Sequence, residues 1–307
     1  MRIDDLESWA YELGFDAVGI TPVVCLTEEE KRLRKWLEEG KHGDMVFLEQ
    51  NIEKRSDPRL LVEGAVSVVV TLTNYYTDSG QDTEGPRIAR YAMGKDYHWV
   101  LKARLAELLN RMEEADGVSG GRCFTDSAPV FEHEWARRAG LGWRGRNTLL
   151  INKEMGSFCL IGVIISRVAS NAYTLPFEGN FCGNCRRCIE HCPTGALTSE
   201  GLDARRCIAY HTIENKGEYP EDIKLKAGNR IFGCDICQEV CPWNAKARPH
   251  KTPEFYPDED VLSLRSEDWK EMTGGRFKKL FKGTPLERTG LKRLKRNIPG
   301  NDAGKTN

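Results

Sequence analysis

The chain has 307 residues, 40% of them hydrophobic and 30% charged, with a formal net charge of −1. These values are ordinary for a globular protein of one large or two average domains, and no apolar run approaches the roughly 20 residues that span a bilayer. The acidic, amphipathic N-terminus is neither a secretory nor a twin-arginine signal. We therefore expect a protein that works in the reducing cytoplasm, without a membrane partner.

The first part of the chain alternates between predicted helices and strands. Apolar residues at helical spacing predict a helix over 3–14, and a short strand follows over 15–22. Residues 27–40 predict another capped helix, and 49–61 are polar before becoming helical. The β-branched run 65–76 is the strongest strand prediction, and we expect it in the middle of a sheet.

The pattern continues beyond a polar loop at 77–86. The remaining predictions are a strand and turn over 87–98, an amphipathic helix over 100–114, a short strand over 122–129, a helix over 130–142 and two strands over 147–166. Together they predict an α+β domain over residues 1–170, with a mixed or antiparallel sheet flanked by helices.

Seven cysteines in two groups dominate the next stretch. Cys182, Cys185, Cys188 and Cys192 stand in a C-x2-C-x2-C-x3-C-P run, the spacing that binds iron–sulfur clusters in bacterial ferredoxins. In such proteins the fourth cysteine binds the cluster of a second motif. A partial motif follows at Cys234, Cys237 and Cys241, again before a proline. Residues 171–247 therefore predict a ferredoxin-like module with two [4Fe-4S] clusters.

The ligands can be divided between the two clusters. The first cluster takes Cys182, Cys185, Cys188 and Cys241; the second takes Cys192, Cys234 and Cys237 and needs one more. Cys207 is the only cysteine between the motifs and is assigned there. Zinc is the alternative, but zinc sites usually show two CxxC pairs with a long spacer. Disulfides would require an oxidising compartment. Cys25, Cys123 and Cys159 are left without a predicted role.

Residues 248–307 predict a basic C-terminal extension. A proline-rich acidic stretch leads into a helix predicted over 260–275, and from 276 to 296 nearly every charge is positive. Lys292, Arg293, Lys295 and Arg296 fall at helical spacing and would form a basic stripe suited to a polyanion. The alternative is a solvated tail. The last residues are expected to be disordered.

Familiar cofactor and nucleotide motifs are absent from the sequence. There is no glycine-rich dinucleotide motif after a strand, no Walker loop and no CxxCH haem motif. The six histidines are scattered, none in a context that would offer an axial ligand to a corrin, so each is predicted to have an ordinary surface or core role. The partner of the iron–sulfur module must therefore be identified in another way.

Seven segments together resemble the epoxyqueuosine reductase family, the iron–sulfur, cobalamin-dependent enzymes of queuosine-tRNA maturation. They are NIEKRSDPRLL (51–61), YAMGKDYH (91–98), TDSAPVFEHEWARRAGLGWRGRNTLLI (125–151), GSFCLIGVII (156–165), CGNCRRCIEHCPTGAL (182–197), RRCIAYHTIE (205–214) and GCDICQEVCPWN (233–244). They cover the chain nearly to residue 296, and those outside the cysteine runs are much more specific than a ferredoxin motif.

This resemblance implies a reductase of epoxyqueuosine at the wobble position of tRNA. Base-off cobalamin would bind a nitroreductase-like domain over 1–170, reduced through both clusters by an unidentified low-potential donor, in a monomeric protein. Asp126 would be the proton donor and a cobalamin neighbour. Matching of family positions implies further cobalamin contacts at Arg55, Leu150, Ile161, Ala209 and Tyr210.

Asp126 also has a simpler interpretation. Because a carboxyl group with an ordinary pKa is ionised at neutral pH, a proton donor here would need a pKa raised by burial. The alternative is that Asp126 caps the helix predicted after it. Two other functions remain open: a cobalamin-dependent reductase of a small molecule, like the reductive dehalogenases, and a ferredoxin-type electron carrier. Cobalamin binding separates the carrier from both enzymes.

Overall fold

The protein is described from a computed structural model, which covers residues 1–78, 81 and 85–298. Its first part holds the helices α1 (Ile3–Glu12), α2 (Thr27–Glu38), α3 (Ile52–Ser56), α4 (Tyr97–Asp116) and α5 (Glu132–Arg138), and the strands β1 (Ala17–Pro22), β2 (Ser67–Asn74), β3 (Arg87–Ile88), β4 (Arg122–Phe124), β5 (Trp143–Arg144), β6 (Leu150–Ile151) and β7 (Cys159–Ser166).

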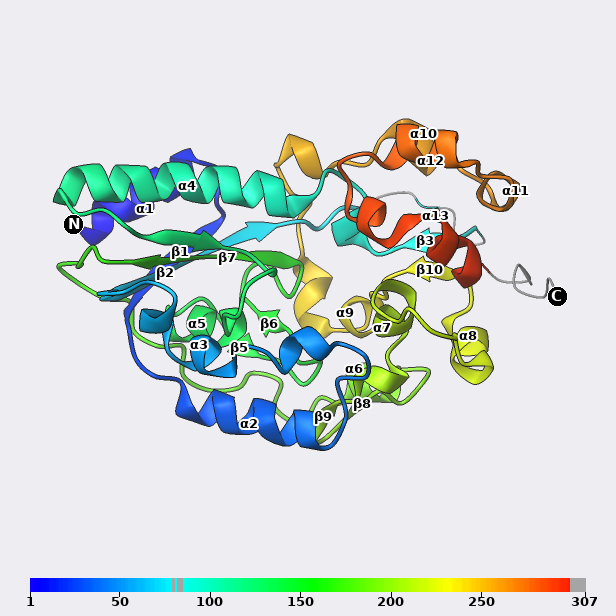
Figure 1. Ribbon diagram of the computed structural model, residues 1–307, viewed down its shortest axis with the longest axis horizontal. Helices are drawn as coiled ribbons and strands as arrows, with labels where there is room; N and C mark the ends of the chain where they lie inside the picture. The colour runs from blue at the N-terminus through cyan, green and yellow to red at the C-terminus, as the bar shows by residue number, and fades with distance from the viewer. Residues whose placement is uncertain (79–80, 82–84, 299–307) are drawn as a thin grey trace.

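The main sheet is antiparallel and has the order β1-β2-β7-β4. Every residue of β2 is buried, and β2 lies between β1 and β7, which confirms the prediction of a central strand. Helices α1 and α4 cover one face, while α5 packs on the other face (Figure 1). Each face has its own hydrophobic core, built around Leu105 on one side and Trp135 on the other.

The longest helix, α4, has clear start and stop signals. The Asp96 carboxylate accepts a hydrogen bond from the His98 N–H and so caps the N-terminus, and Gly117 ends the helix with a φ of 68°. Apolar residues at helical spacing, among them Leu101, Leu105 and Leu108, are fully buried against the sheet. This cap fixes Tyr97 and His98 in the first turn, next to the site described below.

The second part holds the helices α6 (Arg187–Glu190), α7 (Ile208–Ile213), α8 (Glu221–Ala227), α9 (Ile236–Glu239), α10 (Glu259–Leu262), α11 (Ser266–Lys270), α12 (Gly274–Phe281) and α13 (Pro285–Asn297), and the strands β8 (Leu197–Thr198), β9 (Gly201–Leu202) and β10 (Arg230–Phe232). The single helix predicted over 260–275 is wrong, because Ser263, Leu264 and Arg265 separate α10 from α11. The predicted disorder of the last residues and much of the loop at 77–86 lie outside the described residues.

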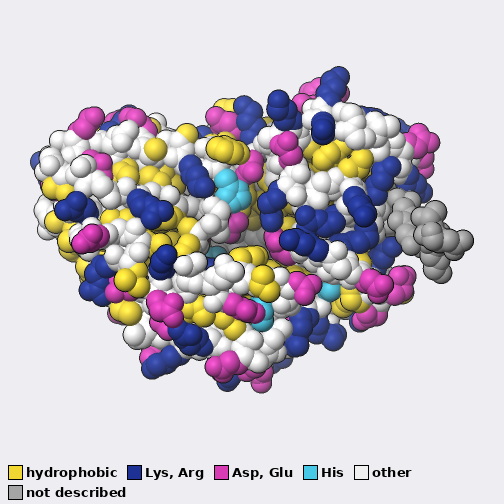
Figure 2. Space-filling model, in the orientation of Figure 1, with side chains coloured by type: hydrophobic (Ala, Val, Ile, Leu, Met, Phe, Trp, Pro, Cys, Tyr) yellow, Lys and Arg dark blue, Asp and Glu magenta, His cyan; other side chains and the backbone are white. Residues whose placement is uncertain are grey.

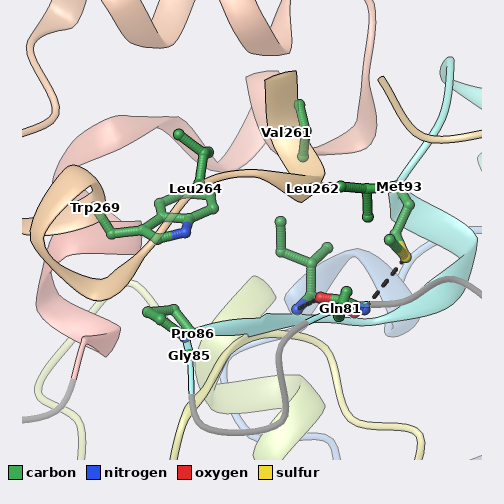
Figure 3. A pocket seen from close by; sticks show the side chains of 9 residues that line it. Gln81, Gly85, Pro86, Met93, Val261, Leu262, Leu264 and Trp269 are labelled. Atoms are coloured by element: carbon green, nitrogen blue, oxygen red, sulfur yellow. Dashed lines mark hydrogen bonds between the residues drawn. The ribbon is translucent and has the colours of Figure 1, made fainter. Parts of the chain in front are cut away.

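A third hydrophobic core joins segments that are far apart in the sequence. It contains Ile88 and Met93 from the first part, Phe232 from β10 and Leu294 from α13. Strand β10 pairs in parallel with β3, so the iron–sulfur region is joined to the first part by backbone hydrogen bonds. A cavity of only about 10 Å³ lies at this core, beside Met93 (Figure 3). It is too small for a cofactor.

Candidate iron–sulfur and reductive site

The fold brings the seven motif cysteines and Cys207 together in the two predicted groups. The Cys188 thiol interacts electrostatically with Cys182, Cys185 and Cys241. In the other group, the Cys207 thiol interacts with Cys192, and the Cys234 and Cys237 thiols interact with Cys207. Helices α6 and α9, which carry the central cysteines of the two motifs, contact each other. The ligand assignment made from the sequence stays a prediction, and this grouping supports it.

Two groups of four thiols match the number of donors that two four-iron clusters require. In the described part of the chain, no group of three or more His, Cys, Asp or Glu side chains is placed to share one metal ion. In a cubane each thiolate binds its own iron, so the four sulfurs stand farther apart than around zinc. All eleven cysteines are free thiols. Burial raises the pKa of Cys123 and of Cys159 to about 12, which leaves both thiols neutral and unreactive.

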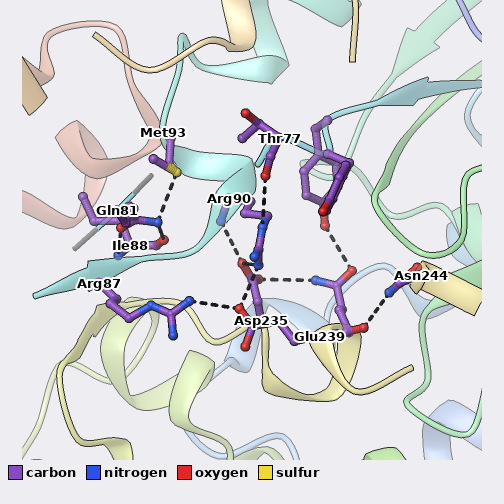
Figure 4. Close-up of polar contacts among 12 residues, drawn as sticks. Thr77, Gln81, Arg87, Ile88, Arg90, Met93, Asp235, Glu239 and Asn244 are labelled. Carbon is purple, nitrogen blue, oxygen red and sulfur yellow. Dashed lines mark hydrogen bonds and ion pairs between the residues drawn. The ribbon is translucent and has the colours of Figure 1, made fainter. Parts of the chain in front are cut away.

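A buried polar network fixes the loop of the second motif to the first part of the chain. The Asp235 carboxylate, next to Cys234, accepts a hydrogen bond from the Arg90 N–H at 2.8 Å. The Arg90 guanidinium pairs with Glu239 at 2.9 Å and donates to the Thr77 carbonyl (Figure 4). Because Arg90 and Asp235 are about 145 residues apart, these bonds hold the cluster loop against the sheet domain.

Asp126 lies on a tight loop between β4 and α5. Its backbone is left-handed, with a φ of 55°, which is uncommon for a residue other than glycine. Its Oδ2 atom accepts a hydrogen bond from the Tyr97 hydroxyl at 2.5 Å and lies 3.6 Å from His98 Nε2. The predicted alternative of a helix cap is wrong, because α5 begins after Phe131 without any side-chain cap.

The charge of Asp126 differs from the expectation. Its side chain is 65% exposed, yet nearby protein atoms still desolvate it. Desolvation acts to raise the pKa, but hydrogen bonds from His98 and Tyr97 outweigh it, and the pKa of Asp126 is lowered. The expected raised pKa is therefore wrong for this arrangement. Desolvation also acts on His98, yet its bonds to Asp126 and Asp96 raise the pKa of His98 to about 9.

Glu132 and Arg55 extend this site. Glu132 Oε1 accepts a hydrogen bond from the Asp126 N–H at 2.6 Å. Desolvation, with the charge of Asp126, raises the pKa of Glu132 to about 8, so its carboxyl group is mostly neutral at pH 7. Arg55 interacts electrostatically with Glu132, and its Nε–H is buried without a hydrogen-bond partner among the described residues. An unpaired buried donor is costly, so Arg55 is ready to bind an acceptor that the protein itself does not supply.

The other predicted contact residues differ in how closely they are connected to the Asp126 loop. Ile161 and Leu150 belong to the same hydrophobic core, and the Ile161 carbonyl accepts from the Thr125 hydroxyl, next to Asp126. Tyr210 is 8% exposed, and its hydroxyl accepts a hydrogen bond from the Asp44 N–H at 2.9 Å. Helix α7 holds Ala209 and Tyr210, and Glu214, the residue directly after its last one, forms an ion pair with Arg288. Arg288 in turn lowers the pKa of Asp126, after His98 and Tyr97.

Sequence reasoning missed His98 and Tyr97. It treated all six histidines as ordinary residues, whereas His98 bridges Asp96 and Asp126. A signal was available, because Asp96 is a helix N-cap and places the two following side chains at a fixed point on the first turn. Their partner Asp126 lies 29 residues away from Tyr97, and only the folded sheet brings them together.

The basic stripe is partly used inside the protein. Lys292 is exposed, but the Arg293 guanidinium donates to the Ile213 carbonyl, and Arg296 donates to the carbonyls of His211, Asn215 and Gly217. Lys and Arg side chains still gather on the surface over α13, beside a hollow near the centre of this face (Figure 2). No helix of the described chain is long and apolar enough to cross a membrane.

Comparison with known proteins matches both regions of the site. Residues 181–244 match the family model of a 4Fe-4S double cluster binding domain, and residues 55–127 match that of Epoxyqueuosine reductase QueG, DUF1730. The epoxyqueuosine reductase of Leadbetterella byssophila is 48% identical, with 96% of each chain covered. A crystal structure of an epoxyqueuosine reductase with an epoxyqueuosine-modified tRNA-Tyr stem loop has a TM-score of 0.88 at 30% identity, covering 96% of this chain and 79% of the other.

A Bacillus subtilis epoxyqueuosine reductase has a TM-score of 0.84 at 29% identity, again over 96% of this chain and 79% of the other; its aspartate-bearing catalytic loop is swung out of the active site. These matches define a mixed helix and sheet protein with a double iron–sulfur cluster domain, an oxidoreductase. The chain belongs to the epoxyqueuosine reductase family.

Proposed function

We propose that this protein reduces epoxyqueuosine to queuosine at the wobble position of tRNA. The observation that carries the proposal is the 48% identity to an epoxyqueuosine reductase over 96% of the chain. The matched epoxyqueuosine reductase family model spans residues 55–127 and so includes Asp126. Removal of an epoxide oxygen as water takes two electrons and two protons. The clusters held by the two cysteine groups would relay the electrons from a low-potential donor. A cytoplasmic monomer is the proposed form of the enzyme.

Cobalamin is the proposed cofactor, held base-off on a nitroreductase-like domain over residues 1–170. The unpaired Arg55 Nε–H, the exposed Asp126 carboxylate and the absence of an axial-histidine motif fit such a group. Arg55, Leu150, Ile161, Ala209 and Tyr210 would contact it. Cobalamin would supply a reduced cobalt able to attack the epoxide. Residues 171–247 would form the ferredoxin-like module and 248–307 the basic extension.

Asp126 is the proposed proton donor. Because its pKa is lowered, the proton has to come from neighbouring groups. His98 is protonated at neutral pH and stands 3.6 Å from the carboxylate, and the Tyr97 hydroxyl already donates to the same oxygen. Because its own carboxylate is ionised, Asp126 would take a proton from His98 as it passes one to the alkoxide of the opened epoxide. Exposed basic residues such as Lys292 would hold the phosphates of the anticodon stem-loop.

The test is anaerobic. The cluster-loaded protein is incubated with cobalamin, a strong reductant and tRNA that carries epoxyqueuosine. The tRNA is then digested and the masses of its nucleosides are measured. A product lighter by one oxygen that forms only with cobalamin is expected. Bound cobalamin and intact clusters without this product would favour a reductase of a small molecule. Failure to bind cobalamin would leave an electron carrier.

A further inference from the structure

The Asp126 loop is fastened to helix α5 by one side chain. Glu132, the first residue of α5, accepts the Asp126 N–H at 2.6 Å and so closes the loop over six residues. The helix is a firm anchor, because Trp135 and Ala136, one turn further on, are fully buried. The left-handed backbone of Asp126 has an energetic cost and persists only where surrounding contacts impose it.

The position of the Asp126 carboxylate follows from that backbone geometry. With the N–H bound to Glu132, the side chain points to Tyr97 and His98, which belong to a different helix. On its N-terminal side the loop is held by Thr125, which is 1% exposed and donates its hydroxyl to the Ile161 carbonyl at 2.9 Å. After Asp126, Lys102 contacts the Ser127 hydroxyl at 3.2 Å, and both of these side chains are exposed. Between Thr125 and helix α5, Glu132 is the side chain that binds the backbone of Asp126 itself.

We propose that Glu132 is a positioning residue, which holds the Asp126 loop in the conformation that places the carboxylate beside Tyr97 and His98. This inference rests on the proposed function, since it concerns the same site. Glu132 acts because its side chain is long enough for its carbonyl oxygen to accept the Asp126 N–H, and not through its charge. Its mostly neutral state agrees with this role, because a second full negative charge here would repel the Asp126 carboxylate.

Two substitutions distinguish the effect of the length of the Glu132 side chain from the effect of its charge. Glu132→Gln keeps the length and the accepting oxygen but cannot ionise, whereas Glu132→Asp keeps the carboxyl group and is one methylene too short. We expect E132D to lose turnover by ten- to a hundredfold, because misplacement of a reacting group has effects of that size. E132Q should retain most of the wild-type turnover. Iron content and cobalamin affinity should match the wild type in both variants.

A second readout does not depend on activity. Asp126 raises the pKa of His98, so NMR titration of the His98 imidazole in the full, cluster-loaded chain reports where the Asp126 carboxylate lies. The His98 signal is assigned by its loss in H98Q. The pKa of His98 should fall in E132D toward its value in D126N, and stay at the wild-type value in E132Q.

Equal impairment of E132Q and E132D would overturn the proposal, because Glu132 would then act through its ionisable group. An unchanged His98 pKa in E132D would overturn it as well. If the His98 pKa follows the expected pattern while the wild-type protein does not act on epoxyqueuosine tRNA, the positioning role stands and the proposed function fails.

Discussion

At the residue scale, the site depends on how Tyr97, His98 and Asp126 share their protons. One carboxylate oxygen, Asp126 Oδ2, accepts from Tyr97 and faces the protonated imidazole of His98. Burial and the negative charge of Asp126 raise the pKa of Tyr97, so the phenol stays protonated. The carboxylate is therefore ionised and flanked by two proton-bearing groups. Such a site can deliver a proton without storing it on the aspartate.

Substitution of Asp126 by Asn tests this arrangement directly. Asn keeps the size and can still accept from the Tyr97 hydroxyl, but it cannot pass on a proton. We expect D126N to bind both clusters and cobalamin as the wild type does and to lose turnover by a factor on the order of 10²–10⁴. Single-turnover assays on tRNA bearing epoxyqueuosine measure the loss. Turnover near the wild-type rate would exclude Asp126 as the donor.

The raised pKa of His98 also predicts a pH dependence of stability. The pKa is about 9 in the folded protein and near 6.5 as a reference, so the contribution of His98 is complete below about pH 6.5 and disappears as pH rises through about 9. The unfolding free energy of the wild type relative to H98Q should fall by up to about 3 kcal/mol over this range. Anaerobic urea unfolding measures it, and a pH-independent difference would contradict the pKa.

At the element scale, α13 is both a structural strap and a basic surface. Arg296 and Asn297 on one side of the helix bind backbone carbonyls of the segment 211–217 and of β10. Lys292 on the same helix is exposed. Helix α13 also carries Arg288, which is paired with Glu214 and lowers the pKa of Asp126. Arg288 thus couples α13 electrostatically to Asp126.

Two substitutions on α13 should affect different properties, one the stability of the fold and the other tRNA binding. R296A leaves three carbonyl oxygens without their donor and should lower the unfolding free energy by about 2 kcal/mol. K292A should change stability by less than about 0.5 kcal/mol but weaken tRNA binding, with a salt dependence reduced by about one ion. Denaturation and filter binding at several salt concentrations measure the two effects. Loss of stability in K292A would contradict this division.

At the scale of the whole molecule, local signals were predictable and long-range contacts were not. Helix α4 and strand β2 follow from periodicity, and the cysteine groups follow from spacing and from the need for a fourth ligand. For His98 the sequence indicates only a place on the first turn after the Asp96 cap, because its role depends on Asp126 across the fold. From the sequence alone, Arg296 is interpreted as a solvated charge, because the α7 carbonyl to which it donates is far away in the chain. Local sequence patterns do not predict such contacts, because the two partners lie far apart in the sequence.

The division of ligands between two clusters is the prediction that spans the molecule, because it joins both motifs with the segment between them. In the fold Cys207 lies with Cys192, Cys234 and Cys237, and a cluster that loses one of four thiolates should be lost or unstable. Anaerobically reconstituted C207A should therefore hold about four iron atoms, against about eight in the wild type. The exposed Cys25 provides the control, since C25A should retain about eight. An iron content near eight in C207A would show that a group other than Cys207 completes the second cluster.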